Sequence, residues 1–538
     1  MQVADFFCGG GGFSEGFRQA GFQIVFAVDK WEPAVTTYKG NKPDVNVIQD
    51  DVIRLSQLSD NEFDELIPDT EIIIGSPPCQ AFSSSNKSGY ADKTLGIVLI
   101  EAYLRIIARK KFKKNSKLKY WVLENVPNSR LYIKDEYTAN DLELEGDFVL
   151  KTRCAAAGIY NAKNFGAPTN RKRFLCGDFP ELEITHTDDN PVVLRAVLDS
   201  LGNPLAEGES IIEDVNYPGF KMRKSEITDF SYIHEVAPFE WEIAKRLKQD
   251  KGYMGKMSFP ENLDKPARTV MATLTSCARE AMILGYLPDR YRLPTVREAA
   301  SMMSFPIDYR FYGKTRGIKQ TLVGNAVPPK LSFAVARAIA KENSLVIPNQ
   351  YVPIQHDTSI EFVNLNNVII PIKKERPRRS VAKFRYHIPY LIIRSYRVEL
   401  TNYHSNFEKE LFKWDAEIHY SQGKKRAAVY TPQVSIDCIP AKYREDISSF
   451  INNTCSQLDT FTSLQINYCK TTEQRRKDCA LGPYELLDTI KAFINKLILP
   501  VDMENPISID DKPNTIPNAI LIGYYILKKI TEYMGGKY

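Results

Sequence analysis

The chain of 538 residues is poor in the features that mark several protein classes. Its nine cysteines form no C-x-x-C pair and no dense, even pattern, which argues against structural zinc and a disulfide framework. Its six histidines are scattered, so we expect no metal site. No run of about 18 apolar residues exists to span a membrane, and the first residues lack the basic stretch and apolar core of a signal peptide. We therefore expect a cytoplasmic protein without membrane contact.

The charge balance is also mild, since a net charge of +5 in so long a chain says little about nucleic acid. The length predicts two or three domains, and 43% apolar with 25% charged residues is ordinary for a globular protein. The basic run at residues 109–114 is most simply the exposed end of a helix. Segments 221–224, 245–248 and 373–379 are better candidates for phosphate contacts.

What the chain does contain begins with a βαβ pattern. A strand at residues 3–7 runs into four glycines, then a helix at 13–20 and a second strand at 24–28 that ends at Asp29. Glycines let the backbone approach a ligand, and an acid at a strand end can accept hydrogen bonds from a ribose. The glycine spacing departs from G-x-G-x-x-G, which disfavours a dinucleotide pyrophosphate.

Two further strand ends carry reactive groups. Cys79 follows the apolar strand at residues 72–75, and Glu124 follows the apolar pair at 122–123. Open α/β sheets place their chemistry at the carboxyl ends of the strands. The pairing of a thiol with a carboxyl group predicts an enzyme that uses covalent cysteine catalysis.

These residues belong to an ordered series of motifs that resembles the DNA (cytosine-5)-methyltransferases from about residue 1 to 342. The series comprises DFFCGGGGF at 5–13, GSPPCQAFS at 75–83, ENV at 124–126, NRKR at 170–173, RLPTVREA at 292–299 and QTLVGNAVPP at 320–329. The resemblance implies an α/β, Rossmann-like methyltransferase domain that uses S-adenosyl-L-methionine and acts on double-stranded DNA.

The resemblance also implies roles for the catalytic residues. Cytosine C5 is a poor nucleophile, so the family adds a cysteine thiolate, here Cys79, to C6 and makes C5 reactive. Glu124 would neutralise the ring at N3. Arg171 and Arg173 would hold the cytosine O2 edge and Glu124, and their charge would lower the thiol pKa. Thr169 stands where the family usually has glutamine, which we expect to change the support of the site without abolishing catalysis.

The cofactor site follows from the same resemblance. Asp29 would bind the ribose, Asp51 with Val52 the adenine, and Trp31 could stack on the adenine or pack in the core. The full expected set is Phe6, Phe7, Gly9, Gly10, Gly12, Asp29, Asp51, Val52, Pro78 and Asn325. Cys8, in the glycine turn, is expected to be an inert, packed thiol.

Access to a base in a duplex requires that the base be flipped out of the stack. The polar stretch at residues 81–94 is suited to a loop that closes over it. Residues 1–180 and 291–342 would form the catalytic domain, and 181–290 a small target-recognition lobe. Arg268, Thr273, Thr275, Ser276 and Arg279 are its candidate base contacts.

Beyond the motifs, residues 343–538 are expected to form an α+β accessory domain with strands at 359–363, 367–372, 390–400, 417–420 and 427–429 and helices near 484–498 and 518–534. Extra DNA contact, protein interaction and stabilisation all remain open as its role. A fused nuclease is disfavoured, because the segment at 415–419 has acids but lacks the usual lysine.

The sequence therefore predicts a monomeric DNA methyltransferase of a restriction-modification or orphan system, with a cognate restriction endonuclease as its partner where one exists. The alternatives are an RNA (tRNA) cytosine-5 methyltransferase and a catalytically inert DNA-binding relative. The size of the 180–290 segment favours DNA over RNA, and the intact set of Cys79, Glu124, Arg171 and Arg173 argues against an inert protein.

Overall fold

The computed structural model describes residues 1–79, 82, 93–250, 256–420, 428–497, 504–509 and 512–536. The chain forms two compact units. The first unit comprises residues 1–236, 260–276 and 281–372, and the second comprises 237–259, 277–280 and 373–538. Residues 343–372, which the sequence assigned to the accessory segment, thus belong to the first unit.

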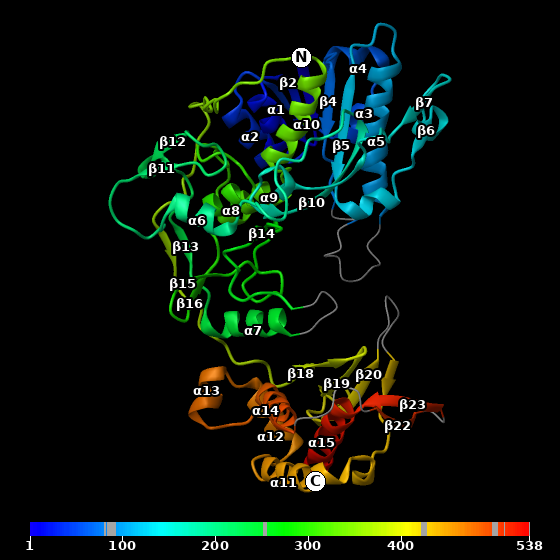
Figure 1. The fold of residues 1–538 in the computed structure, drawn as a ribbon, viewed down its shortest axis with the longest axis vertical. Helices are drawn as coiled ribbons and strands as arrows, with labels where there is room; N and C mark the ends of the chain where they lie inside the picture. Colours follow the sequence, from blue (N-terminus) through cyan, green and yellow to red (C-terminus); the bar gives the residue numbers. More distant parts are fainter. Residues whose placement is uncertain are drawn as a thin grey trace. The chain divides into compact units, whose positions relative to one another are not determined.

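A seven-stranded sheet in the order β3-β2-β1-β4-β5-β10-β8 is the centre of the first unit (Figure 1). Its strands are β1 (Gln2–Phe6), β2 (Gln23–Asp29), β3 (Asn46–Gln49), β4 (Ile72–Gly75), β5 (Tyr120–Asn125), β8 (Gly158–Asn161) and β10 (Lys172–Asp178). The pairs among β1 to β5 are parallel, whereas β10 runs antiparallel to both β5 and β8. The carboxyl ends of β1, β2, β4 and β5 therefore meet along one edge, where open α/β sheets bind ligands.

Helices cover both faces of this sheet because its strands are apolar on both sides. One face packs against α1 (Gly12–Gln19), α2 (Glu32–Asn41) and α10 (Pro329–Glu342). The other packs against α3 (Val52–Ser56), α4 (Asp60–Leu66) and α5 (Thr94–Phe112). The α/β, Rossmann-like fold predicted from the sequence is confirmed.

Helices α1 and α10 approach closely although they lie at opposite ends of the catalytic motifs. The Ser332 hydroxyl donates to the Phe13 carbonyl at 2.6 Å. A Cβ on Gly16 would lie 1.9 Å from Ser332 Oγ, so only glycine permits this contact. Helix α10 thus packs mainly on α1.

The rest of the first unit holds short strands and three helices around a further core. The helices are α6 (Leu194–Leu201), α8 (Val296–Met302) and α9 (Arg316–Asn325). The strands are β6 (Glu136–Thr138), β7 (Val149–Lys151), β9 (Thr169–Asn170), β11 (Ile211–Glu213), β12 (Lys221–Arg223), β13 (Tyr232–His234), β14 (Ala267–Arg268), β15 (Leu284–Leu287), β16 (Arg290–Arg292) and β17 (Val368–Ile370).

Residues 343–372 are fastened to this core by a buried ion pair. Lys319 Nζ lies 2.7 Å from Asp229 Oδ1, and both side chains are fully buried. The Lys319 ammonium also donates to the Val363 carbonyl, and Asp229 accepts from the Leu365 amide at 2.9 Å. Strand β17 adds a parallel pairing with β13.

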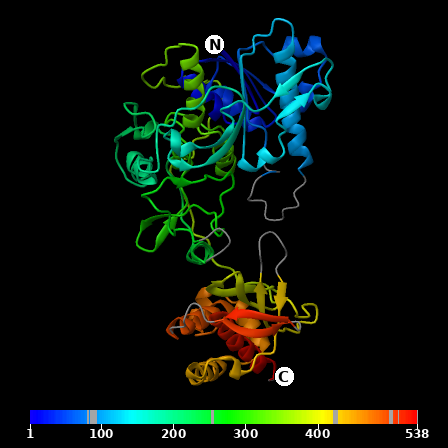
Figure 2. The ribbon, with the colours of Figure 1, turned by 45° about the vertical axis from the view of Figure 1, so that its right-hand side comes forward.

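The second unit has a four-stranded antiparallel sheet with helices beside it (Figures 1 and 2). The sheet comprises β18 (Arg385–Ile393), β19 (Tyr396–Thr401), β20 (Asp415–Tyr420) and β21 (Ala428–Tyr430), and a separate hairpin comprises β22 (Glu504–Ile509) and β23 (Lys512–Pro517). The helices are α7 (Pro238–Gln249), α11 (Ala441–Cys455), α12 (Phe461–Cys469), α13 (Thr472–Lys477), α14 (Pro483–Lys496) and α15 (Asn518–Gly535).

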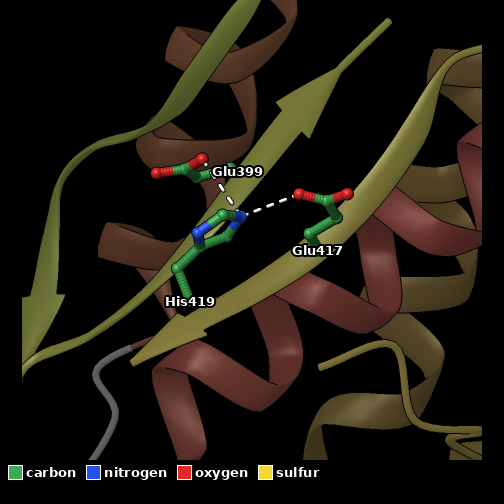
Figure 3. Close-up of side chains that lie close together, drawn as sticks. All are labelled: Glu399, Glu417 and His419. Carbon is green, nitrogen blue, oxygen red and sulfur yellow. Dashed lines mark hydrogen bonds and ion pairs between the residues drawn. The ribbon is translucent and has the colours of Figure 1, made fainter. Parts of the chain in front are cut away.

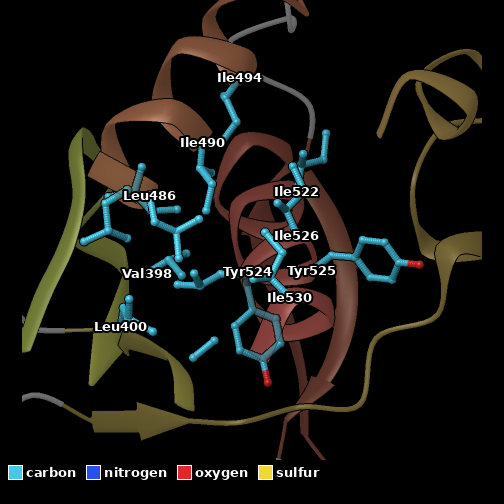
Figure 4. Packing of buried hydrophobic residues seen from close by; sticks show 14 of the residues in the cluster. Val398, Leu400, Leu486, Ile490, Ile494, Ile522, Tyr524, Tyr525, Ile526 and Ile530 are labelled. Atoms are coloured by element: carbon cyan, nitrogen blue, oxygen red, sulfur yellow. The ribbon is translucent and has the colours of Figure 1, made fainter. Parts of the chain in front are cut away.

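One face of this sheet forms the core of the second unit. Val398 and Leu400 of β19 pack among Leu486 and Ile490 of α14 and Ile526 of α15 (Figure 4). Burial of such side chains, worth about 1.5–3 kcal/mol each, gives this unit a core of its own. The predicted α+β character is confirmed.

Three local expectations were wrong. Residues 359–363 form no strand, and the expected strand at 390–400 is a hairpin that turns at Arg394 and Ser395, where φ is 46° and 70°. Lys110 is buried instead of exposed, and its ammonium lies 3.0 Å from Asp64 and 2.9 Å from Asp69.

Among the described residues, no helix has the length and apolar character that crossing a membrane requires.

Candidate active site

A cavity of ≈ 360 Å³ opens at the carboxyl edge of the central sheet. The predicted residues that line it are Phe7, Gly9, Gly10, Gly12, Asp29, Pro78, Cys79, Glu124, Arg173 and Asn325. They come from the ends of β1, β2, β4, β5 and α9 and from the start of β10. Expected catalytic and cofactor residues thus share one space.

The glycine turn between β1 and α1 forms one wall. Phe7 lines the cavity with φ of 54°, and Gly9 and Gly11 also have positive φ. The Asp29 carboxylate holds this turn, because it accepts from the Gly9 amide at 2.9 Å and from the Trp31 amide at 2.8 Å. Burial raises the pKa of Asp29, and these two backbone donors offset part of that rise. Each oxygen keeps a second lone pair for a ligand hydroxyl.

Two glycines of this wall have different surroundings. A Cβ at Gly12 would lie 2.3 Å from the Val327 carbonyl, so the first and last motifs meet at backbone contact. A Cβ at Gly9 would meet no atom within 4 Å and would project into open space beside the cavity. The turn therefore leaves room that a ligand can occupy.

Cys79 lies in the segment that follows β4. The Asn125 side-chain amide donates to the Pro77 carbonyl at 3.1 Å and ties this segment to the end of β5. Burial raises the pKa of the Cys79 thiol, and the positive charge of Arg173 lowers it by less. The net direction is upward, so the expected lowering of the thiol pKa by the arginines is outweighed.

Glu124 is held from two sides. Arg173 Nε lies 2.8 Å from Glu124 Oε1, and the Ser76 hydroxyl donates to Glu124 Oε2. Glu124 is 4% exposed and Arg173 8%. Ser76, which the sequence did not single out, therefore joins the site, and its place directly after a buried strand was the available signal.

Arg171 lies outside the lining of the cavity. Its guanidinium donates to the carbonyls of Val270, Gly324 and Ala326 at 3.2, 2.9 and 3.1 Å. Burial, and then the charge of Arg173, lower the pKa of Arg171. Its role in the structure is to fix the backbone on either side of Asn325. Thr169 is fully buried and its hydroxyl lies 3.3 Å from the Arg268 carbonyl.

Three expected cofactor residues also lie away from the cavity lining. Phe6 is fully buried and packs against Phe26 and Tyr103, because alternate residues of a central strand point to opposite faces. Val52 is buried in the same core. Asp51 caps α3 by accepting from the Ile53 amide at 2.9 Å and pairs with Lys30 at 2.7 Å.

Several lining residues were not among the predicted cofactor set. Trp31 lines the cavity and is 37% exposed, which leaves its ring accessible for stacking. Cys8 is buried, and burial raises its thiol pKa well above the ordinary value. The others are Phe13, Pro77, Val126, Thr321, Leu322 and Val327. No local pattern distinguishes these residues from ordinary core residues.

The predicted DNA contacts are distributed over both units. In the first unit, Arg268 Nε lies 2.7 Å from Glu261 Oε2. In the second, Arg246 pairs with Asp488 and Lys373 with Glu240, and Lys248 is fully buried. These three are therefore engaged inside the second unit, whereas Lys374, Arg376 and Arg379 are exposed.

Of the expected closing loop, residues 81 and 83–92 lie outside the described residues.

The sheet order, with its antiparallel strand β10, and a cavity at the carboxyl edge define a class I methyltransferase fold. The sequence matches the family described as C-5 cytosine-specific DNA methylase over residues 1–341. The chain belongs to this family and is a DNA (cytosine-5)-methyltransferase. The description of this family names DNA as the substrate.

Two curated relatives agree with this assignment, and a solved structure is similar in part. The chain is 30% identical over 351 residues to the type II methyltransferase M1.HphI of Haemophilus parahaemolyticus, covering 64% of this chain and 88% of the relative. It is 28% identical over 348 residues to M.MthTI of Methanothermobacter thermautotrophicus, covering 64% and 98%. The solved Entamoeba histolytica methyltransferase EhMeth is 15% identical with a TM-score of 0.40 and covers 64% of this chain and 98% of that structure.

Proposed function

We propose that this chain methylates C5 of cytosine at a specific sequence in double-stranded DNA, by covalent catalysis through Cys79 on a flipped base. One observation carries the proposal: Cys79, Glu124 and Arg173 line the same cavity as the glycine turn and Asp29. The nucleophile, the acid and the expected cofactor wall are therefore within one small space.

The residues present fit S-adenosyl-L-methionine. The absence of a side chain at Gly9 leaves space beside the turn, the Asp29 oxygens can accept from ribose hydroxyls, and the Trp31 ring offers a stacking surface. When bound, this cofactor supplies the methyl group that cytosine C5 takes. Asn325 and Pro78 would close the cavity beside the reacting carbon.

The chain's own groups account for the chemistry at the base. The Cys79 thiolate would add to C6, which places negative charge on the ring and makes C5 nucleophilic. Glu124 would meet that charge at N3, in the orientation that Arg173 and Ser76 fix. After methylation, loss of the C5 proton and breakage of the Sγ–C6 bond would restore the aromatic ring and the free thiolate.

We further propose that the enzyme acts as a monomer in a restriction-modification or orphan system, where a cognate endonuclease would cut the same unmethylated sequence. Two named relatives are type II methyltransferases, which supports this context. The segment at 181–290 would read the target sequence. Methylation sequencing of DNA from cells that express the chain would establish both activity and target.

A covalent trap tests the mechanism directly. Target DNA with 5-fluorocytosine should form a denaturant-resistant adduct, because fluorine cannot leave C5 as a proton does. Cys79→Ser should abolish the adduct and methyl transfer while S-adenosyl-L-methionine still binds. Cys8→Ser is the matched control, since Cys8 lines the same cavity, and its adduct should persist. An adduct that survives Cys79→Ser would overturn the assignment of the nucleophile.

A further inference from the structure

The sheet of the second unit has a polar face that the methyltransferase chemistry does not use. Strands β19 and β20 pair so that Glu399 lies opposite Glu417 and Arg397 opposite His419. Directly opposite residues of an antiparallel pair project to the same face, as do residues two apart on one strand. These four side chains therefore share one face, while the alternate residues Val398 and Ile418 enter the core.

The polar group is buried to an unusual degree. Glu399, Glu417 and His419 are 5%, 4% and 3% exposed. The two carboxylates converge on the His419 ring (Figure 3). The ring's Nε2 lies 2.8 Å from Glu417 Oε2 and 3.1 Å from Glu399 Oε2. Buried ionisable groups are costly unless they are paired or coordinate a metal.

Protein donors do not satisfy this group completely. His419 Nε2 carries at most one hydrogen, and it hydrogen-bonds to Glu417. Arg397 Nε donates to the other oxygen of Glu399, at 2.5 Å. Arg385 Nε is 3.7 Å from Glu399 Oε2, beyond hydrogen-bond distance. Glu399 Oε2 is consequently buried without a hydrogen-bond partner. It lies near His419 Nε2, the same atom that Glu417 Oε2 contacts.

We propose that Glu399, Glu417 and His419 bind a divalent transition-metal ion. An octahedral ion with bonds of about 2.1 Å places neighbouring ligand atoms about 3.0 Å apart, which agrees with the 2.8 and 3.1 Å separations. One imidazole with two carboxylates suits Zn²⁺ or Mn²⁺. The ion would coordinate Glu399 Oε2, which is buried without a hydrogen-bond partner.

The surroundings of the site fit a metal centre. His404 Nε2 lies 2.9 Å from the outer oxygen of Glu417, so it can orient that carboxylate as outer partners of metal ligands do. The His404 side chain is 54% exposed, which gives the site a solvent-facing rim through which an ion can enter. Three protein ligands would leave coordination positions free for water or an oxygen anion. The sequence suggested no such site because Glu399 lies on a different strand from the other two ligands.

The test uses the full chain after treatment with a chelator. Mn²⁺ is the probe, followed by electron paramagnetic resonance, because its preference for oxygen and nitrogen ligands makes the nine cysteines poor competitors. We expect one ion per chain, and affinity at least about tenfold weaker in both His419→Asn and Glu399→Gln. Glu445→Gln, which removes an exposed carboxylate from the same unit, should bind Mn²⁺ like the unaltered protein.

Thermal melting provides the second measurement and guards against unfolded variants. Mn²⁺ should raise the melting temperature of the unaltered protein and of Glu445→Gln, and should raise that of Glu399→Gln by clearly less at the same Mn²⁺ concentration. If His419→Asn does not fold, Glu399→Gln alone decides. A folded, unaltered chain that binds neither Mn²⁺ nor Zn²⁺ stoichiometrically would overturn the proposal and leave a buried ion-pair network.

Discussion

Arg173 Nε contacts Glu124 Oε1 at 2.8 Å inside a site where both side chains are nearly inaccessible to water. The arginine therefore compensates the carboxylate that the proposed mechanism places at cytosine N3. Glu124→Gln keeps the shape of the acid but removes its proton, so we expect methyl transfer to slow by about 100-fold or more. Cofactor affinity, measured by calorimetry, should change little. If Glu124→Gln weakened only the affinity for the cofactor, Glu124 would have to be assigned to the cofactor site instead of to catalysis.

Removal of the arginine should have a different signature. Arg173→Ala leaves a buried carboxylate without its ion partner, which typically costs about 3–5 kcal/mol of stability. We expect a lower melting temperature together with slower methyl transfer. Lys172→Ala, an exposed neighbour, is the control and should change neither. A stable Arg173→Ala protein would show that Glu124 is balanced by other groups.

The raised thiol pKa of Cys79 predicts a pH dependence. Because the pKa lies above its ordinary value, the thiolate is a small fraction near neutral pH and grows by about tenfold per pH unit below that pKa. Single-turnover methylation should accelerate as pH rises from 7 to 9, while cofactor binding at the same pH values serves as the control. A rate independent of pH would mean that DNA binding deprotonates the thiol before the measured step.

Arg171 is predicted to act on stability more than on chemistry. Its three backbone carbonyl partners would each lose a charged donor in Arg171→Ala, at about 1–3 kcal/mol for each group left unsatisfied. The melting temperature of Arg171→Ala, measured by calorimetry, should therefore lie well below that of Lys172→Ala. Should Arg171→Ala melt normally but fail in catalysis, the guanidinium would have to reach the cavity.

Residues 343–372 are predicted to be part of the catalytic unit. A chain of residues 1–372 keeps the Lys319 contact with Val363, whereas 1–342 loses it and leaves the buried pair with Asp229 exposed to water. We expect 1–372 to bind S-adenosyl-L-methionine and 1–342 to aggregate or bind more weakly. Both chains lack residues 373–538, so the comparison isolates the 30 residues between the two ends.

Phosphate contact by the basic segment can be tested without truncation. Replacement of Lys374, Arg376 and Arg379 with alanine should flatten the salt dependence of DNA binding. The slope of log K against log salt concentration should become less steep by about 0.9 for each lost phosphate contact. A control that removes Lys409, Lys442 and Lys477 lowers the net charge equally from other exposed positions of the second unit. Equal slopes in the two variants would remove the phosphate-contact hypothesis.

Much of the sheet and the core of the site could be predicted from the sequence, because they depend on local patterns. The alternation of strand, glycine turn, helix and acid located β1, α1 and Asp29 to within one or two residues, and strand ends located Cys79 and Glu124. Where a side chain points is a different matter. Phe6 and Phe7 are neighbours, yet one enters the core and the other lines the cavity.

The misses have physical reasons. The hairpin between β18 and β19 turns on Arg394 and Ser395, both in the left-handed region, without the Asn-Gly or Asp-Gly signal that usually marks such turns. The burial of Lys110 depends on Asp64 and Asp69, which lie more than 40 residues earlier. Contacts of that kind arise from tertiary packing and leave no local trace.

The contact between Ser332 and Phe13 joins residues 319 positions apart. At synthesis rates of about 5–20 residues per second, helix α1 leaves the ribosome roughly 15–60 seconds before α10 is available to cover it. During that time the apolar face of α1, which includes Phe13 and Phe17, is not yet covered by α10. The catalytic fold can therefore be completed only after residue 342 has been synthesised, and until then the apolar face of α1 is exposed to non-native contacts.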